Sequence, residues 1–208
     1  MCTVARNFDL GFGHFHGEPG LHVCQIYSDS DERLSALMKF IKGGGSIGEK
    51  ISLFTDAIGT DQLRTWFSGN SMGYEADSPA VSITDPRETY FENGTFNPDT
   101  MLERLKKFYL TATEEGYPAA RVIGDMLPEV ETIDGGDRLT EYESRVSLLQ
   151  REHPVTTVCQ YDAGKFSGKT IMEILQVHPY ILSGGEIIEN PLFISPEDYL
   201  TRIGWSDV

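Results

Sequence analysis

The chain has 208 residues, with 17 Lys and Arg against 32 Asp and Glu and a formal net charge of -15. Its 39% of hydrophobic residues suffice for a domain with a sizeable core. The acidity argues against a surface for duplex DNA or an anionic membrane, because phosphate groups are bound by clustered Lys and Arg. With no membrane-length apolar run, no signal-peptide pattern and an odd number of cysteines, we expect a cytoplasmic protein that binds neither nucleic acid nor membrane directly.

Apolar runs alternate along the chain with amphipathic stretches. The apolar runs predict five strands, at 21–27, 50–56, 80–85, 119–126 and 155–161. The helical spacing of apolar residues predicts five helices, at 30–42, 60–68, 99–115, 138–152 and 170–177. We expect the glycines at 43–45 to end the first helix. A last strand or hairpin is expected around 187–188 and 192–194.

Strands that alternate with helices are typical of right-handed crossovers and a mostly parallel sheet. Continuous apolar strands favour helices on both faces. The predicted fold class is therefore α/β, in a single domain over residues 21–208 that follows an N-terminal lead-in of residues 1–20. A short repeat, HVCQIY at 22–27 and TVCQY at 157–161, either places Cys24 and Cys159 on neighbouring strands or is a coincidence.

Acidic residues mark the ends of several predicted strands. Ligands of parallel sheets bind outside the carboxyl ends of the strands, so these residues could shape a polar pocket. An Asp at a strand end more often only begins a turn or caps the next helix. The residues concerned are Asp29, Asp56, Asp85, Asp125 and Asp162.

The segment Ala163–Thr170, AGKFSGKT, matches the loose pattern of a phosphate-binding loop between a strand and a helix. A phosphate cradle needs backbone N–H groups that turn inward, whereas Lys165 and Phe166 occupy the middle of this loop. Residues 171–208 are too few for a nucleotide fold unless the chain is permuted. Asp125 would have to act as the magnesium-side carboxylate. We favour a solvated loop that caps the following helix.

Potential metal ligands cluster near the N-terminus, within eleven positions: His14, His16, His22 and Cys24. Their spacing matches no closed zinc site, so we expect no bound metal. A composite site of His22 or Cys24 with Cys159 and His178 is nevertheless geometrically conceivable.

Two other kinds of chemistry have weaker support. Cys24 and Cys159 lie inside predicted strands, where a buried thiol is inert rather than nucleophilic. A carboxylate pair of Asp125 and Glu129, with Glu141 and Glu143 on the next helix, suits acid–base work or a cation. Glu residues on helices are more often solvated, so we do not expect this pair to act without other support.

Several motifs follow one another in a characteristic order from about residue 21 to residue 191. They are LHVCQIYSDSDERLSALMKFIKGGGSIGEKISLFTD at 21–56, RVIGDM at 121–126, YE at 142–143, CQYD at 159–162 and HP at 178–179. Together they resemble the MEDS domain, the sensory domain of methanogens and methylotrophs. Each motif alone is weak, but their joint order is fairly specific and covers most of the chain.

The resemblance implies a RecA-like or KaiC-like fold without a working phosphate loop. It also implies a non-enzymatic sensor in prokaryotic signal transduction that binds small hydrocarbon or one-carbon derivatives, needs no cofactor and signals through a kinase or transcription regulator. Carried over by position, the candidate ligand-binding residues are His22, Tyr27, Asp125, Glu143, Cys159 and Tyr161. Two features depart from the family pattern: Asp125 is shorter than the Glu of many relatives, and residues 8–20 lie outside it.

Other functions stay open at this point. A nucleotide-binding protein would use Lys169 and Thr170 and show magnesium-dependent turnover. A degenerate RecA-like domain that binds only a protein partner would expose an apolar patch. A metal sensor is a further option, and the sequence leaves a homodimer open.

Overall fold

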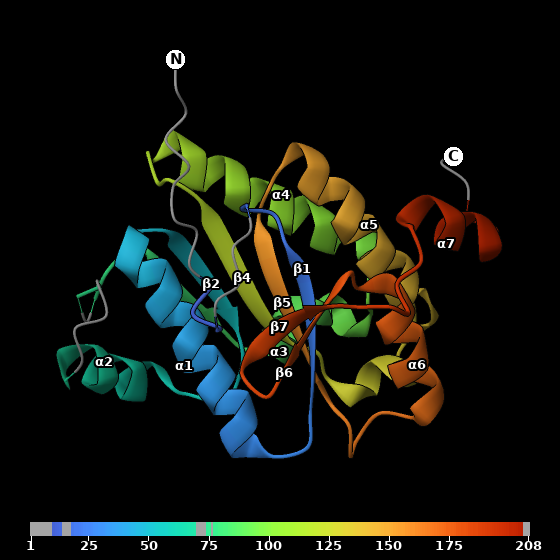
Figure 1. Ribbon diagram of the computed structural model, residues 1–208, viewed down its shortest axis with the longest axis horizontal. Coiled ribbons are helices and arrows are strands. Elements are labelled where there is room, and N and C mark those ends of the chain that lie inside the picture. The colour runs from blue at the N-terminus through green and yellow to red at the C-terminus, as the bar shows by residue number, and fades with distance from the viewer. Residues whose placement is uncertain (1–9, 14–17, 70–73, 76, 206–208) are drawn as a thin grey trace.

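The computed structural model describes residues 10–13, 18–69, 74–75 and 77–205. Its strands are β1 (His22–Tyr27), β2 (Lys50–Phe54), β3 (Val81–Thr84), β4 (Ala120–Asp125), β5 (Thr156–Asp162), β6 (Tyr180–Ser183) and β7 (Glu186–Glu189). They form one seven-stranded sheet of order β3-β2-β4-β5-β1-β6-β7 (Figure 1). All neighbouring strands are parallel except β7, which runs antiparallel to β6. The predicted α/β class with a mostly parallel sheet is confirmed.

Helices cover both faces of this sheet. They are α1 (Ser30–Ile47), α2 (Thr60–Gly69), α3 (Pro86–Tyr90), α4 (Pro98–Glu114), α5 (Leu139–Glu152), α6 (Gly168–Val177) and α7 (Pro196–Arg202), with short 3-10 turns η1 (Glu92–Gly94), η2 (Pro128–Glu131) and η3 (Gly136–Arg138). Helices α1 and α2 pack on one face, and α4, α5 and α6 on the other. No helix of the described residues is long and apolar enough to cross a membrane.

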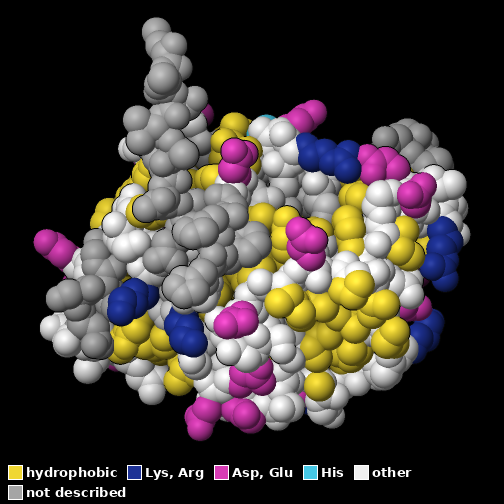
Figure 2. All heavy atoms as spheres, viewed as in Figure 1, with side chains coloured by type: hydrophobic (Ala, Val, Ile, Leu, Met, Phe, Trp, Pro, Cys, Tyr) yellow, Lys and Arg dark blue, Asp and Glu magenta, His cyan; other side chains and the backbone are white. Residues whose placement is uncertain are grey.

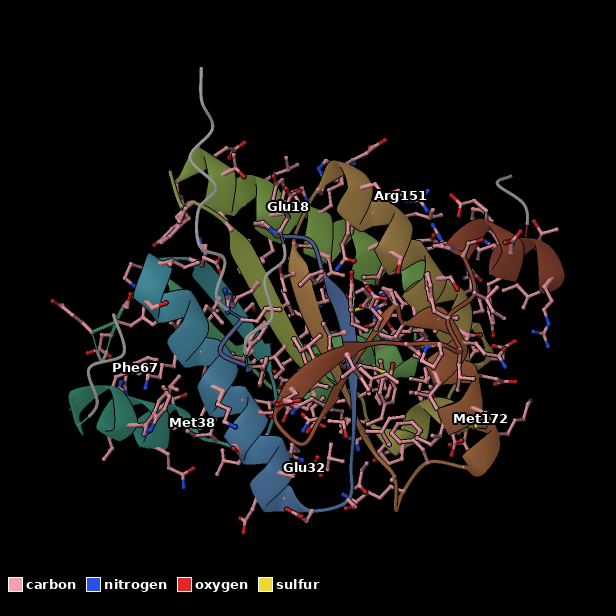
Figure 3. All side chains as sticks on the ribbon, in the orientation of Figure 1. Glu18, Glu32, Met38, Phe67, Arg151 and Met172 are labelled. Carbon is pink, nitrogen blue, oxygen red and sulfur yellow. The ribbon has the colours of Figure 1, made fainter. Side chains whose placement is uncertain are left out.

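Each face of the sheet has its own hydrophobic core. Leu37 and Phe40 of α1 are fully buried in the first core, together with Leu10 and Phe12 from the described part of the lead-in. The second core lies under α4, α5 and α6. Helix α7 packs on the outside of α5, where Arg151 donates to the Glu197 carboxylate at 3.2 Å (Figure 3). Strands covered on both faces explain the continuous apolar runs of the sequence.

The first helix does not end at the glycines, contrary to the prediction. It continues to Ile47 and ends at Gly48, whose φ of 72° suits a glycine C-cap. The glycines at 43–45 are buried inside the helix. A Cβ on Gly44 would lie 2.7 Å from Ile51 Cδ1 and 3.0 Å from the Arg121 side chain. Close packing against the sheet, rather than helix termination, therefore explains this glycine.

The end of the chain also differs from the prediction. A β6–β7 hairpin is present and includes residues 187–188, but 192–194 lie outside any strand. The Asn190 side chain donates to the carbonyls of Leu175 and His178, at 2.5 and 2.7 Å. Its carbonyl accepts from Leu192 N at 3.0 Å. These bonds hold the chain against α6 after β7, which explains why the strand does not continue.

Candidate functional site

A cluster of polar side chains is buried between the sheet and helices α5 and α6. We call it the inner cluster, and it consists of His22, Glu143, Cys159, Tyr161 and His178. All five residues are at most 9% exposed. The Glu143 carboxylate is at the centre. Its Oε2 lies 3.1 Å from His22 Nε2 and 3.6 Å from both Cys159 Sγ and His178 Nε2, and its Oε1 accepts from the Tyr161 hydroxyl.

The alternation of side chains along the strands builds this cluster. Residues 22 and 24 of β1 and residues 159 and 161 of β5 point to the face that α5 covers. Cys24 and Cys159 are direct register partners, which confirms that the short repeat places them on neighbouring strands. On α5, Glu143 and Ser147 are one turn apart and both contact His22. His178 directly follows α6, and its Nδ1 lies 2.8 Å from the Ile174 carbonyl.

Burial dominates the electrostatics of the inner cluster. It lowers the pKa of His22 and of His178 to about 3, so both imidazoles are neutral at pH 7. Burial raises the pKa of Glu143, which His178 and the Tyr161 hydroxyl partly offset. Burial also raises the pKa of Cys159 well above its usual range, with the Glu143 charge as a further cause. Its thiol is therefore protonated, in agreement with the expectation of an inert cysteine.

One nitrogen of the cluster is not satisfied. His178 Nε2 is fully buried and has no hydrogen-bond partner among the described residues. The ring of His178 lies against that of His22, with 4.0 Å between their centroids. Because buried polar atoms are normally paired, this nitrogen marks a place where something can bind.

A second polar group, the outer cluster, lies on the opposite face at the carboxyl ends of β1 and β4. It consists of Tyr27, Arg33, Asp56 and Asp125. The Tyr27 hydroxyl and Arg33 Nη1 bind the two Asp125 oxygens at 3.1 and 2.9 Å, and Arg33 also binds Asp56 at 2.6 Å. Burial raises the pKa of Asp125 to about 6, although the Arg33 charge and the Tyr27 hydrogen bond oppose the shift.

The six residues predicted to bind a ligand thus fall into two groups. His22, Glu143, Cys159 and Tyr161 meet in the inner cluster, and Tyr27 and Asp125 meet in the outer cluster. His22 and Tyr27 are five positions apart on one strand, and an odd separation places side chains on opposite faces. His22 and Tyr27 also lie at opposite ends of β1.

Other residues of this region also differ from what the sequence predicts or lie outside the described part of the chain. Glu143 is fully buried rather than solvated, which corrects the expectation for helical Glu residues. His178 and Arg33 were not among the predicted ligand-site residues. For His178 the HP motif after a helix was the available signal, whereas nothing in the sequence singled out Arg33. His14 and His16 lie outside the described residues.

The loop at 163–170 connects β5 to α6, and Ser167 caps that helix, as expected. The Glu131 carboxylate accepts hydrogen bonds from Ser167 N at 3.1 Å and from Thr170 Oγ1 at 2.5 Å. A phosphate at this helix terminus would need the same donors. The Lys169 side chain is 83% exposed and lies 3.6 Å from Glu173. A carboxylate of the chain therefore stands where a nucleotide phosphate would bind.

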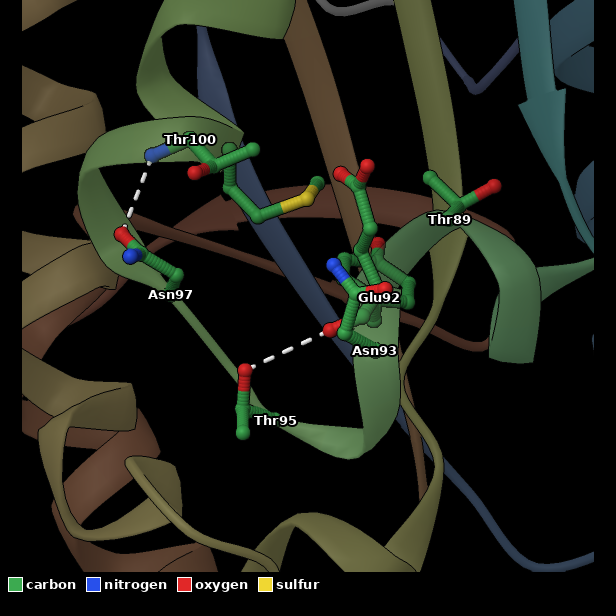
Figure 4. A pocket seen from close by; sticks show the side chains of 8 residues that line it. Thr89, Glu92, Asn93, Thr95, Asn97 and Thr100 are labelled. Carbon is green, nitrogen blue, oxygen red and sulfur yellow. Dashed lines mark hydrogen bonds between the residues drawn. The ribbon is translucent and has the colours of Figure 1, made fainter.

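Two surface pockets lie on the side of the sheet that carries α4 and α6. One of about 470 Å³ opens beside the same α6 terminus, lined in part by Glu131, Thr170 and Tyr199. Another of about 250 Å³ lies between α3, η1 and α4 (Figure 4). In the second pocket the Asn97 side chain caps α4 by accepting from Thr100 N at 3.1 Å, so part of its polar lining serves the local fold. None of the six predicted ligand residues lines either pocket.

Comparison with solved structures concerns the fold. A KaiC-like protein from Pyrococcus horikoshii is similar with a TM-score of 0.58 and 17% identity, over 85% of this chain and 79% of that one. The flagellar accessory protein FlaH from Methanocaldococcus jannaschii has a TM-score of 0.51 and 12% identity, over 83% and 77%. The RadB recombinase has a TM-score of 0.53 and 12% identity, over 80% and 75%. These similarities confirm the predicted RecA/KaiC-like fold.

Comparison of sequences concerns the family. The transcriptional repressor DcmR of Methylorubrum extorquens is 32% identical over 158 residues, which cover 76% of this chain and 57% of the repressor. The chain thus spans little more than half the length of that relative. A family model described as "MEthanogen/methylotroph, DcmR Sensory domain" matches residues 21–179. The match extends over most of the chain, and the chain belongs to the MEDS family of sensory domains.

Proposed function

We propose that the protein is a non-enzymatic sensory domain that binds a small ligand at the inner cluster and passes the signal to a partner protein. The observation that carries the proposal is the Glu143 carboxylate, fully buried beside His178 Nε2, which has no hydrogen-bond partner among the described residues. A buried carboxylate and an unpaired buried nitrogen favour the binding of a ligand that supplies the missing hydrogen bonds. The sensory family and the repressor relative support a regulatory role for that guest.

The surroundings of the inner cluster suit a small hydrocarbon or one-carbon derivative. Phe166 packs edge-to-face on Tyr161 at 5.3 Å, and Ile174 is fully buried beside them. Apolar walls with a few convergent polar groups are typical of small-molecule sites. One polar atom of such a compound would contact Glu143 or His178, while its carbon atoms would contact the aromatic rings.

The outer cluster, on the opposite face of the sheet, would transmit ligand binding at the inner cluster to the rest of the protein. Strand β1 carries both His22 and Tyr27, and Arg33 of α1 binds Asp125 beside Tyr27. A ligand that favours one packing of β1 over another would change this contact, by no more than its difference in affinity for the two states. A transcription regulator is the favoured partner, because the relative is a repressor.

Thermal unfolding with a panel of small alcohols, halomethanes and methylamines tests the ligand. A ligand at 100 times its Kd stabilises the folded state by about 2.7 kcal/mol, or about 5–10 °C in Tm for a chain of this size. The shift should disappear in Glu143→Gln and persist in Glu141→Gln, whose carboxylate pairs instead with Arg138 and Arg145. A shift with ATP and Mg²⁺ and none with any organic compound would reverse the proposal.

A protein-interaction function is the second candidate, because one surface favours it. Figure 2 shows apolar side chains gathered where α6 and β7 lie in Figure 1. Met172, Ile188 and Leu192 are 44–49% exposed, and β7 is the last strand of the sheet. Self-association through this surface would give a concentration-dependent dimer in sedimentation experiments, which Ile188→Lys would abolish. A monomer at all concentrations would contradict it.

A further inference from the structure

We infer that the inner cluster is a binding site for one divalent transition-metal ion such as Zn²⁺, held by His22 Nε2, Glu143 Oε2, Cys159 Sγ and His178 Nε2. The inference rests on the proposed function in taking the inner cluster as the sensing site, and it names a metal ion as a component of that site. Binding of the ion displaces the proton of the Cys159 thiol to solvent. Two neutral imidazoles, the resulting thiolate and a carboxylate form a donor set that Zn²⁺ and Co²⁺ accept readily.

The distances between the four donor atoms match a tetrahedral ion. Zn–N, Zn–O and Zn–S bonds of ordinary length keep N and O ligand atoms about 3.4 Å apart and place S about 3.6 Å from either. In the structure His22 Nε2 lies 3.1 Å from Glu143 Oε2, and Cys159 Sγ lies 3.6 Å from each of these atoms. His178 Nε2 is 3.6 Å from Glu143 Oε2. All four atoms lie within 4.8 Å of one another, so an ion needs little rearrangement.

The groups behind the donor atoms orient them toward a cation. The Ile174 carbonyl can only accept a hydrogen bond, so the neutral His178 ring carries its proton on Nδ1, 2.8 Å away. Nε2 then presents a lone pair toward Glu143 Oε2, which is also an acceptor. On the other side, the Ser147 hydroxyl can accept a hydrogen bond from His22 Nδ1 at 2.9 Å. Metal-binding histidines usually hold their second nitrogen in this way.

Among the described residues, no Lys or Arg balances the negative charge of the Glu143 carboxylate, whose ion pairs are with His22 and His178 alone. An isolated carboxylate in an apolar core is costly, and a bound cation removes that cost. The spacing of His14, His16, His22 and Cys24 predicts no metal site, and the composite site considered from the sequence, His22 or Cys24 with Cys159 and His178, lacks Glu143. Folding instead assembles ligands from β1, α5, β5 and the end of α6.

Titration of the purified chain with Co²⁺ tests the inference directly. Because the cluster is buried, Co²⁺ is added both to the native protein and during refolding from denaturant. We expect one ion per chain, the strong visible absorption of tetrahedral Co²⁺, and a thiolate-to-cobalt charge-transfer band. Cys159→Ser should lose the charge-transfer band and bind at least about 100-fold more weakly, and Ser147→Ala about 10-fold more weakly. Circular dichroism verifies that each variant is folded.

Cys24→Ser is the matched control. Cys24 is buried on the same face and is the register partner of Cys159, but it is not one of the four ligands. This variant should keep the charge-transfer band and the affinity of the wild type. Absence of stoichiometric binding in both titrations, or equal effects of Cys24→Ser and Cys159→Ser, would overturn the inference.

The proposed function and the metal inference can fail separately. If organic compounds stabilise chelator-treated wild type but not Glu143→Gln, and no Co²⁺ binds, the sensory proposal holds and the metal inference is wrong. If Co²⁺ binds as described while no organic compound has an effect with or without the metal, the metal inference holds and the organic-ligand proposal is wrong.

Discussion

The buried ion pair between Glu49 and Arg121 gives the sharpest prediction about the scaffold. Glu49 lies between α1 and β2, and Arg121 lies on β4; their side chains are 1% and 0% exposed. Arg121 Nε donates to the Glu49 carboxylate, and Nη1 donates to the Phe40 carbonyl at 3.0 Å. The guanidinium also stacks on the Phe40 ring, 4.9 Å from its centroid. This pair therefore ties the end of α1 to the sheet.

Glu49→Gln should destabilise the protein severely. The change keeps the shape of the side chain but removes the charge that faces a buried guanidinium. Breaking a buried pair by removing one partner costs about 3–5 kcal/mol. For a chain of this length, that loss lowers Tm by about 6–20 °C. Urea unfolding followed by circular dichroism measures the free energy of unfolding directly.

Two further variants separate charge from packing. Glu115→Gln removes the carboxylate that pairs with Lys50, but Glu115 is 47% exposed, so this control should lose less than about 1 kcal/mol. The double variant Glu49→Leu with Arg121→Met removes both buried charges and should recover most of the loss. If Glu49→Gln costs no more than Glu115→Gln, the description of this pair as a buried, charge-dependent contact is wrong.

Three other predictions concern the clusters and α1. The pKa of Asp125 is raised from 3.8 to about 6, so the folded state holds more protons than the unfolded state between these values. Its stability relative to Asp125→Asn should therefore fall by about 2–2.5 kcal/mol as pH rises from 4 to 8, measured by urea unfolding at each pH. Gly44→Ala should lose about 1–2 kcal/mol, because overpacking against Ile51 outweighs the gain in helix propensity; a more stable variant would contradict this. In metal-free protein, Glu143→Gln should be neutral or stabilising at pH 8, and a loss near that of Glu49→Gln would refute it.

The strand pattern of the sequence predicts much of the inner cluster. Residues 22, 24, 159 and 161 follow the alternation of two apolar strands. The repeated VCQ motif leaves open whether Cys24 and Cys159 are neighbours, and the register of β1 and β5 shows that they are. The same alternation predicts the separation of Tyr27 from His22, because their spacing is odd. The family resemblance does not use this parity, and it therefore suggested a single set of six residues.

The helical contribution could not be predicted in the same way. Glu141 and Glu143 of α5 are both buried, and only the packing of α5 on β1 and β5 determines that Glu143, rather than Glu141, contacts His22. The glycines at 43–45 signal helix termination by propensity, yet the Arg121 side chain from a distant strand requires one of them inside the helix. In both cases the deciding contact is between residues far apart in the sequence, where local patterns carry no information.

Glu49 and Glu143 show why the inner cluster, rather than the scaffold, is the place to look for function. Both side chains are 1% exposed, so the loss of water destabilises both carboxylates to a similar degree. The fold compensates Glu49 with the Arg121 guanidinium, whereas among the described residues it gives Glu143 only neutral imidazoles, a thiol and a hydroxyl. A carboxylate kept in an apolar core without a cation of its own lowers stability, and such a local conflict is expected at sites that bind something. Helix α5 supplies Glu143 and also contacts α7 on its outer side. A ligand or ion bound to the Glu143 carboxylate would therefore change the packing of the helix that links the core to the surface.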